Sequence, residues 1–392
     1  MHPETGKLWK ITREYVTHAA IGGVILLLTG FVPEEFLVHL LTDVHVSEGA
    51  IHLWSIGIDI RIVAVMVGVC IIVGDLVVRR RMAVSYAGGG RSATASTSAG
   101  VEQNGVVPTT EHASTPMPPV RYCTTKDGIH LAYAIHGDGP ALVFVGHWFG
   151  HLTLDWEYPS RRRFFERLGR GRTLLRYDSR GNGLSDRKID KISHAAWVSD
   201  LETVVDAAGL GRFAIIGLSQ TVPVAITYAV QHPERVTHLI VYGGYALGWK
   251  HFSTAERDQQ IAMNELTRVA WDRDNPAFRQ MWTTQFMPSA PKEAFDAFTE
   301  MGRRYTTGEA VARHMEATGD VNIVSQLPLL TVPTLVLHAR DDQRVPFECS
   351  QQIAAGIPGA RLVALPGNNH IPIQGDAAYE QMFTEIDRFL RN

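Results

Sequence analysis

The chain has 392 residues, of which 45% are hydrophobic and 20% are charged, and its formal net charge is −3. Roughly two or three structural units are expected at this length, and the charge argues against nucleic acid as a partner because no basic field neutralises phosphates. Three widely separated cysteines, Cys70, Cys123 and Cys349, give neither a disulfide framework nor a CxxC metal site. We therefore expect no metal and no cofactor.

Two apolar runs predict a membrane anchor in residues 1–81. The first, at residues 15–32, carries no formal charge over about eighteen residues, the lower range for a helix that crosses a bilayer. The second span covers about 58–78, and after Ile62 its only charged residue is Asp75. A cleaved signal peptide is disfavoured because no small-residue cleavage site follows the first run, whereas a second run does. The alternatives are one span with an interfacial helix and a soluble helical hairpin.

Basic residues close to the two spans predict their orientation. Three precede the first span and three follow the second, whereas the loop between the spans has no Lys or Arg before Arg61. Because basic flanks stay in the cytoplasm, both chain ends are expected there, and the protein is expected in the plasma membrane as a multi-pass protein. The flanking residues are Lys7, Lys10, Arg13, Arg79, Arg80 and Arg81.

Histidines in the same hairpin raise the alternative of a haem site. His18 opens the first span and His52 precedes the second, so an antiparallel hairpin places them on opposite sides of the membrane. His39 and His52 can approach each other only at the outer surface. We therefore interpret these side chains as interfacial histidines.

Residues 82–119 are rich in Gly, Ser, Ala, Thr and Pro and contain few large apolar side chains. Such a segment cannot bury enough surface to order itself and predicts a disordered linker. A flexible chain of this length has a root-mean-square reach of roughly 35 Å. The following domain is thus expected to move beside the bilayer.

From residue 120 to residue 392, strand and helix patterns alternate, which predicts an α/β domain with helices on both faces of a mostly parallel sheet. Two runs, at 120–125 and 129–137, flank Lys126-Asp127-Gly128 and predict an antiparallel hairpin at the sheet edge. Six apolar runs suited to buried strands complete eight strands. These runs begin at Ala141, Arg172, Arg212, Thr237, Pro333 and Ala360.

Residues of about 245–327 have helical patterns without strand signals and predict a helical cap over the site. The cap is rich in large apolar side chains, including Trp249 and Trp282. Most such residues form cap core, but some must line a cavity, which predicts a small substrate with an apolar part. We expect Trp249, Trp282, His147 and Phe149 to contact it.

The sequence Gly217-Leu218-Ser219-Gln220-Thr221 ends a predicted strand and opens a helical stretch. That is the context of a nucleophile elbow, a tight turn that projects the serine hydroxyl above the sheet. A serine after a strand is more often only a helix N-cap. Small residues usually stand two positions on either side of the serine, and Thr221 departs from this pattern.

Two further polar groups follow strands in the order that a serine nucleophile requires. Serine needs a base to accept its proton, and the base needs a carboxylate to fix its tautomer. Asp342 follows the run that starts at Pro333, and His370 follows the run that starts at Ala360. A solvated turn acid and a loop histidine are plausible singly, but three residues in this order favour catalysis.

Residues of about 120–392 resemble the α/β-hydrolase superfamily, and Asp178-Ser179-Arg180-Gly181-Asn182-Gly183-Leu184-Ser185 resembles its DxRGxGxS segment. They resemble in particular the hydrolase domains found fused to adenylate or guanylate cyclase and regulatory domains. The resemblance implies an α/β-hydrolase fold, with Ser219 as nucleophile, His370 as general base and then acid, and Asp342, rather than Asp341, as orienting acid. The other matching segments are Trp148, His151-Leu152, Trp156-Glu157 and VVDAAGLGRFAIIG.

An oxyanion hole needs two backbone N–H groups that point at the developing negative charge. We expect one from Gln220, directly after Ser219, and the other from Trp148 in the loop after the third strand. Relatives usually have His-Gly in that loop, whereas this chain has Gly146-His147.

These patterns predict a membrane-anchored serine hydrolase that cleaves an ester, thioester or lactone. A catalytically weak ligand-sensing or scaffold module is the first alternative, favoured by the departures at Thr221 and His147. A perhydrolase or carbon–carbon bond hydrolase with the same triad is the second. The sequence leaves the substrate and the oligomeric state open.

Overall fold

The computed structural model of the chain describes residues 116–391. The predicted membrane hairpin lies outside these residues, as does the predicted linker up to residue 115. Within the described range, no helix combines the length and the apolar character needed to cross a bilayer.

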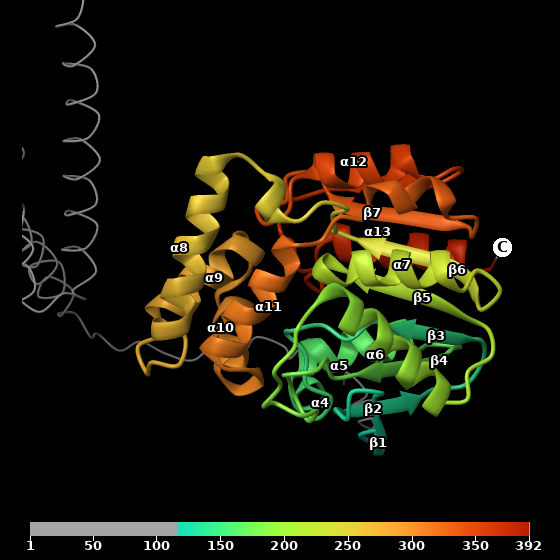
Figure 1. Cartoon of the computed structure of the whole chain (residues 1–392), viewed down its shortest axis with the longest axis horizontal. Helices are drawn as coiled ribbons and strands as arrows, with labels where there is room; N and C mark the ends of the chain where they lie inside the picture. The colour runs from blue at the N-terminus through green and yellow to red at the C-terminus, as the bar shows by residue number, and fades with distance from the viewer. Residues whose placement is uncertain (1–115, 392) are drawn as a thin grey trace, which may run out of the picture. The chain divides into compact units, whose positions relative to one another are not determined.

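Eight strands form one sheet in the order β1-β2-β4-β3-β5-β6-β7-β8 (Figure 1). β1 pairs antiparallel with β2, β2 pairs antiparallel with β4, and all other neighbours are parallel. The predicted mostly parallel, eight-stranded sheet is confirmed. The strands are β1 (Val120–Thr124), β2 (His130–His136), β3 (Ala141–Phe144), β4 (Thr173–Tyr177), β5 (Phe213–Leu218), β6 (Val236–Tyr242), β7 (Thr334–Ala339) and β8 (Arg361–Leu365).

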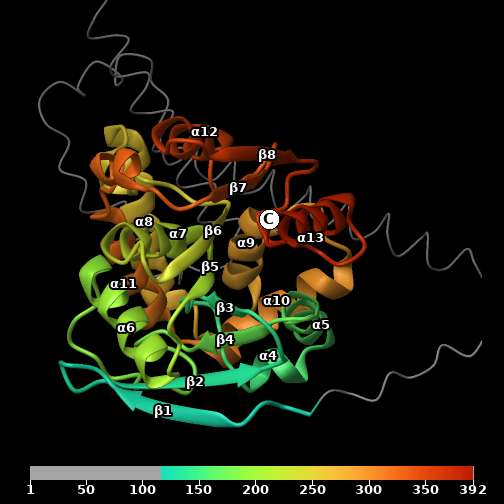
Figure 2. The same cartoon turned by 90° about the vertical axis from the view of Figure 1, so that its right-hand side faces the viewer.

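Helices cover both faces of the sheet, and for this reason its central strands are apolar along their whole length. Side chains from α6, α7 and α12 pack into one core and those from α5 and α13 into the other. Figure 2 shows α5 and α13 on one side of the sheet and α6 and α7 on the opposite side. The helices are α4 (Leu154–Glu157), α5 (Pro159–Leu168), α6 (His194–Ala207), α7 (Val222–Gln231), α12 (Phe347–Gly356) and α13 (Ala377–Phe389).

Four helices between β6 and β7 gather at one end of the sheet (Figure 1). Local sequence sets their limits: Ser253 and Glu256 form a capping box at the start of α8, and the Thr307 hydroxyl caps α11. Their large apolar side chains form a third core, which includes Trp148 and Phe149 from the loop after β3. The elements are η3 (Trp249–His251), α8 (Thr254–Ala270), α9 (Ala277–Phe286), α10 (Lys292–Tyr305), α11 (Gly308–Gly319) and η4 (Val324–Leu329).

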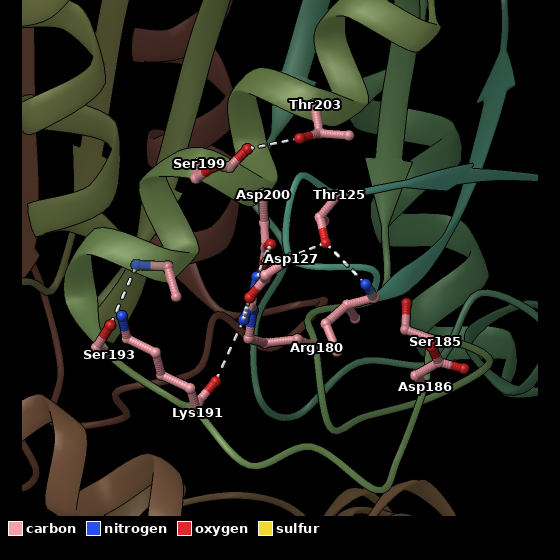
Figure 3. Close-up of polar contacts among 12 residues, drawn as sticks. Thr125, Asp127, Arg180, Ser185, Asp186, Lys191, Ser193, Ser199, Asp200 and Thr203 are labelled. Carbon is pink, nitrogen blue, oxygen red and sulfur yellow. Dashed lines mark hydrogen bonds and ion pairs between the residues drawn. The ribbon is translucent and has the colours of Figure 1, made fainter.

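Arg180, in the loop after β4, connects three segments that are distant in sequence (Figure 3). Its guanidinium donates to both carboxylate oxygens of Asp200 in α6 and to Asp127 in the turn between β1 and β2. The side chains of Arg180 and Asp200 are each 1% exposed. We call this set of Arg180, Asp200 and Asp127 the Arg180 brace. It holds the loop after β4 against the sheet edge and α6.

Candidate active site

Ser219 occupies a sharp turn between β5 and α7. β5 ends at Leu218, a single 3-10 turn covers Ser219–Thr221, and α7 begins at Val222. Ser219 has φ of +51°, and it is the one non-glycine residue with positive φ in the described range. A side chain in this left-handed region is strained, and such strain is frequent where a side chain must be presented to a reactant.

The residues on either side of Ser219 explain how the turn closes. A Cβ atom at Gly217 would lie 2.9 Å from the carbonyl oxygen of Thr221, so glycine is required there. The Thr221 hydroxyl accepts from Leu218 N–H at 2.8 Å and donates to Leu218 C=O at 2.9 Å. The threonine that departs from the usual small residue therefore ties both ends of the turn together. Its side chain does not line the cavities that contain Ser219.

The structure brings His370 and Asp342 together. His370 Nδ1 lies 2.7 Å from Asp342 Oδ2, and both side chains are fully buried. The other carboxylate oxygen accepts backbone N–H groups from Arg344 at 2.7 Å and Val345 at 3.0 Å. Burial alone raises the pKa of Asp342, but the positive charge of His370 when it is protonated and the hydrogen bonds from His338, His370 and Val345 N–H outweigh it and hold the pKa well below its usual value. Asp342 is therefore an ionised acceptor for the imidazole.

A second histidine, His338 in β7, contacts the same carboxylate. Its Nε2 lies 2.9 Å from Val345 C=O and 3.2 Å from Asp342 Oδ2, and its Nδ1 lies 2.6 Å from Ser350 Oγ. A carbonyl can only accept, so Nε2 carries a proton that points between the carbonyl and the carboxylate. Sequence reasoning missed this residue, since His338 sits inside an apolar run that reads only as a buried strand.

Gly243, directly after β6, makes room for the histidine–aspartate pair. It has φ of +57°, and a Cβ there would lie 3.1 Å from His370 Cε1 and 3.7 Å from Asp342 Oδ2. The Gly243-Gly244 pair after the sixth strand is the signal that could have revealed this requirement.

The loop after β3, which carries Trp148, is held by the DxRGxGxS segment. Asp178 accepts the Leu152 N–H at 3.0 Å, and the Asn182 side-chain amide donates to Gly150 C=O at 2.5 Å. Asp178 also accepts the Leu184 N–H at 2.8 Å. The DxRGxGxS segment thus positions the loop of the predicted oxyanion donor.

His147 brings an imidazole into the loop after β3. Its Nδ1 accepts the Phe149 N–H at 3.0 Å, which leaves the ring proton on Nε2. Burial, and then the neighbouring charges of His370 and Arg161, lower its pKa well below the usual value, so the ring is neutral. His147 and Phe149 line a small cavity of about 30 Å³ that also contains Ser219 and His370.

A larger cavity of about 100 Å³ also contains Ser219, and we call it the Ser219 cavity. Trp148 and Gln220, the predicted oxyanion donors, and Trp249, a predicted substrate contact, line it. Trp282, another predicted contact, is buried in the cap behind Phe286. The remaining lining residues are Tyr245, Leu247, Phe252, Gln260, Phe286, Met315, Thr318, Arg344, Val345, Pro346 and Cys349.

Cys349 lines the Ser219 cavity, and burial raises the pKa of its thiol to about 11. This cysteine is therefore not a competing thiolate nucleophile. In the described part of the chain, no hydrogen bond joins Ser219 to His370, and such bonds are often long until substrate binds. No cluster of three or more His, Cys, Asp or Glu suited to a metal ion occurs among residues 116–391.

The cap contributes directly to the position of His370. The carbonyl of Phe286, the last residue of α9, accepts the backbone N–H groups of His370 at 2.8 Å and Ile371 at 3.2 Å. The Phe286 ring also lies 5.6 Å from the His370 ring. A backbone contact of this kind has no side-chain signature, and sequence reasoning therefore missed it.

Comparison with known proteins places the sequence in a family. The sequence profile described as "alpha/beta hydrolase fold" matches residues 140–374, more than half of the chain. Proteins named "Putative carbamate hydrolase RutD" from Caulobacter sp. (strain K31) and Variovorax paradoxus (strain S110) are 26% and 27% identical over 251 and 254 residues. The alignments cover 63% of this chain in both cases, and 90% and 92% of the relatives.

Solved structures show the same fold. An esterase (EaEST) from Exiguobacterium antarcticum matches with a TM-score of 0.60 and 22% identity over 69% of this chain and 99% of that chain. An enol-lactonase from Burkholderia xenovorans LB400 matches with a TM-score of 0.58 and 19% identity over 69% of this chain and 100% of that chain. At these identities the likeness concerns the fold.

Proposed function

Since the chain belongs to the α/β-hydrolase family and is an enzyme of the hydrolase type, we propose that it is a serine hydrolase acting through Ser219, His370 and Asp342. The substrate is an ester, thioester or lactone. One observation carries the proposal: a serine held at positive φ shares a cavity with a histidine that is hydrogen-bonded to an ionised carboxylate.

The proposed reaction has two steps. Ser219 Oγ attacks the substrate carbonyl while His370 Nε2 takes its proton, and the carbonyl oxygen becomes an oxyanion. The N–H groups of Trp148 and Gln220 stabilise that charge. When the carbonyl reforms, the bond to the leaving group breaks and His370 returns the proton to it. Water, activated by His370, then attacks the acyl-enzyme and releases the acid and free Ser219.

In this mechanism Asp342 keeps the proton of neutral His370 on Nδ1, so that Nε2 faces Ser219. It also stabilises the imidazolium that forms in each step. The two backbone donors to Oδ1 and the contact from His338 fix the carboxylate while Oδ2 serves His370. His338 therefore acts as a positioning residue.

The small size of the Ser219 cavity favours a short substrate, and its aromatic lining favours an apolar part. The carbamate and lactone named for the relatives are also compounds in which a carbonyl is attacked. A perhydrolase or carbon–carbon bond hydrolase would use the same three residues.

A ligand-sensing or scaffold module is the competing function, and the lack of a Ser219–His370 hydrogen bond in residues 116–391 favours it. Labelling with a fluorophosphonate probe separates the two functions. We expect the wild type to label and both Ser219→Ala and His370→Ala to remain unlabelled. Folded wild-type protein that resists the probe would contradict the enzyme proposal. Rates of hydrolysis for a series of 4-nitrophenyl esters of increasing acyl chain length then show how long an acyl chain the pocket accepts.

For the N-terminal region we propose a membrane anchor of two spans, at about 15–32 and 58–78, with the hydrolase domain on the cytoplasmic side. The support is the sequence: two long apolar runs flanked by basic residues. Protease should cleave the linker at 82–119 in inside-out vesicles and spare it in intact cells. Cleavage only in intact cells would reverse the orientation, and recovery of the protein without membranes would contradict the anchor.

A further inference from the structure

Arg344 lines the Ser219 cavity without a carboxylate partner. Its Nη1 donates to Gln285 Oε1 at 3.1 Å, and its Nη2 lies 3.6 Å from Met315 Sδ. No ion pair joins it to an acid in the part of the chain that the structure describes. A guanidinium has five N–H donors, so a neutral amide oxygen and a weakly accepting sulfur leave most of its capacity unused.

Two aromatic rings fix this guanidinium in place. Its Cζ lies 5.3 Å from the ring centroids of both Trp282 and Phe286, and these rings stack on each other at 5.6 Å. Contacts of this geometry attract a cation to the ring face. Since Phe286 also contacts His370, the guanidinium is held one ring away from the proposed base.

The surroundings make Arg344 a source of positive potential inside the cavity. It is the one charged residue in the described lining, where the other polar side chains, such as Gln220, Gln260 and Thr318, are neutral. Burial disfavours the charged form and lowers the pKa of the guanidinium, although nearby Asp342 acts in the opposite direction. A half-buried cation is unfavourable unless it is paired. An apolar side chain would fill the same space without this cost if the cavity received only apolar groups.

We infer that the substrate of this enzyme carries a carboxylate, or an anion of similar shape, that pairs with Arg344. The planar fork of arginine matches a carboxylate through two parallel hydrogen bonds. Because the cavity is small, the anion lies only a few bonds from the carbonyl that Ser219 attacks. The inference rests on the proposed function and adds a charged group to the short, partly apolar substrate.

A matched pair of ligands tests this inference without turnover. Monomethyl succinate carries a carboxylate, and methyl succinamate has nearly the same shape with an uncharged amide in its place. Both are titrated calorimetrically into Ser219→Ala protein. We expect the anion to bind at least about tenfold more tightly, the effect of a charge-assisted hydrogen bond. Equal affinities, or no measurable binding of monomethyl succinate, would overturn the inference.

Two further variants in the Ser219→Ala background locate the preference. Arg344→Met should abolish it, and Arg344→Lys should retain a weaker preference because the charge remains without the fork. Arg340→Met is the control: Arg340 is exposed, lies near the same loop, and does not line the cavity. A preference that survives Arg344→Met, or that Arg340→Met removes equally, would contradict the assignment.

Fluorophosphonate labelling of the wild type decides the proposed function separately. Labelling without an anion preference would retain the serine hydrolase and overturn the anion site. An anion preference without labelling would retain the site and overturn the hydrolase.

Discussion

Arg180 and Arg344 differ in their partners within residues 116–391: the guanidinium of Arg180 is paired with carboxylates, and that of Arg344 is not. Arg180 is 1% exposed and is fully engaged with the carboxylates of Asp200 and Asp127. Arg344 lies at the Ser219 cavity and meets an amide oxygen and a sulfur. In the Arg180 brace every charge is paired within the protein. At the cavity the charge of Arg344 has no ion-pair partner among the described residues and can bind an anion of another molecule.

The same contrast extends to neighbouring groups. The Asp178 carboxylate accepts two backbone N–H groups and holds the loop after β3. At the cavity, by contrast, Ser219 is strained and the buried side-chain oxygen of Gln220 has no hydrogen-bond partner among the described residues. The polar groups of the loop after β4 therefore stabilise the fold, while the cavity holds polar groups that are free to bind a substrate.

The largest expected effect concerns chemistry at the cavity. Asp342→Asn should lower kcat/KM by about 10⁴-fold, because an amide no longer fixes the reactive tautomer of the base. The rate of ester hydrolysis measures the loss of activity, and urea denaturation of the same variant shows whether the fold remains stable. A loss below about tenfold in folded protein would mean that Asp342 is not the orienting acid, and Asp341→Asn is the matched control.

At the Arg180 brace the expected effect is on stability. Arg180→Met should lower the free energy of unfolding by about 3–5 kcal/mol, because it leaves the Asp200 carboxylate buried and unpaired. Urea denaturation measures the change. The double variant Arg180→Met/Asp200→Leu should recover most of it. Arg344→Met, which leaves no ion-paired acid behind, should change stability by less than about 1 kcal/mol.

Asp342 also links the site to stability through pH. Its pKa in the folded protein lies below the value of 3.8 expected for an unfolded aspartate. The ionised carboxylate therefore contributes stability that is complete above about pH 5 and is lost as the pH falls through the folded pKa. The difference in unfolding free energy between wild type and Asp342→Asn should shrink below pH 4. A difference that grows in acid would reverse the sign of this shift.

The smallest expected effect isolates backbone strain at Ser219. Ser219→Gly should be more stable than Ser219→Ala by about 1 kcal/mol, because both lack the hydroxyl but only glycine adopts positive φ without strain. Thermal unfolding of the two inactive variants measures it. Equal stability would mean that the turn relaxes when the serine is replaced.

The sequence predicted the fold well because its strands are continuous apolar runs that end in polar residues. It also predicted which residues the site brings together, since Asp342 and His370 lie at the ends of neighbouring parallel strands. It missed contacts that have no local pattern. The backbone of Phe286 holds a loop some eighty residues away. The sequence also showed Thr221 only as a departure from the usual small residue, whereas its hydroxyl closes the turn through Leu218.

The sequence also did not predict that Arg344 lacks an ion-pair partner in the part of the chain that the structure describes. Along the chain it is one more basic residue in a polar turn, and only the folded structure reveals that it forms no ion pair with an acid within the described residues. Pairing of long, flexible charged side chains depends on tertiary packing, which a single sequence does not encode in its periodicity.

Trapping of the acyl-enzyme tests the central claim most directly. Wild-type protein is mixed with 4-nitrophenyl acetate, quenched in acid during the first turnover, digested and analysed by mass spectrometry. We predict one acetyl group on the peptide that contains Ser219, and none in Ser219→Ala. Ester hydrolysis by the wild type with the acetyl group on another residue, or with no trapped acyl group at all, would contradict the account.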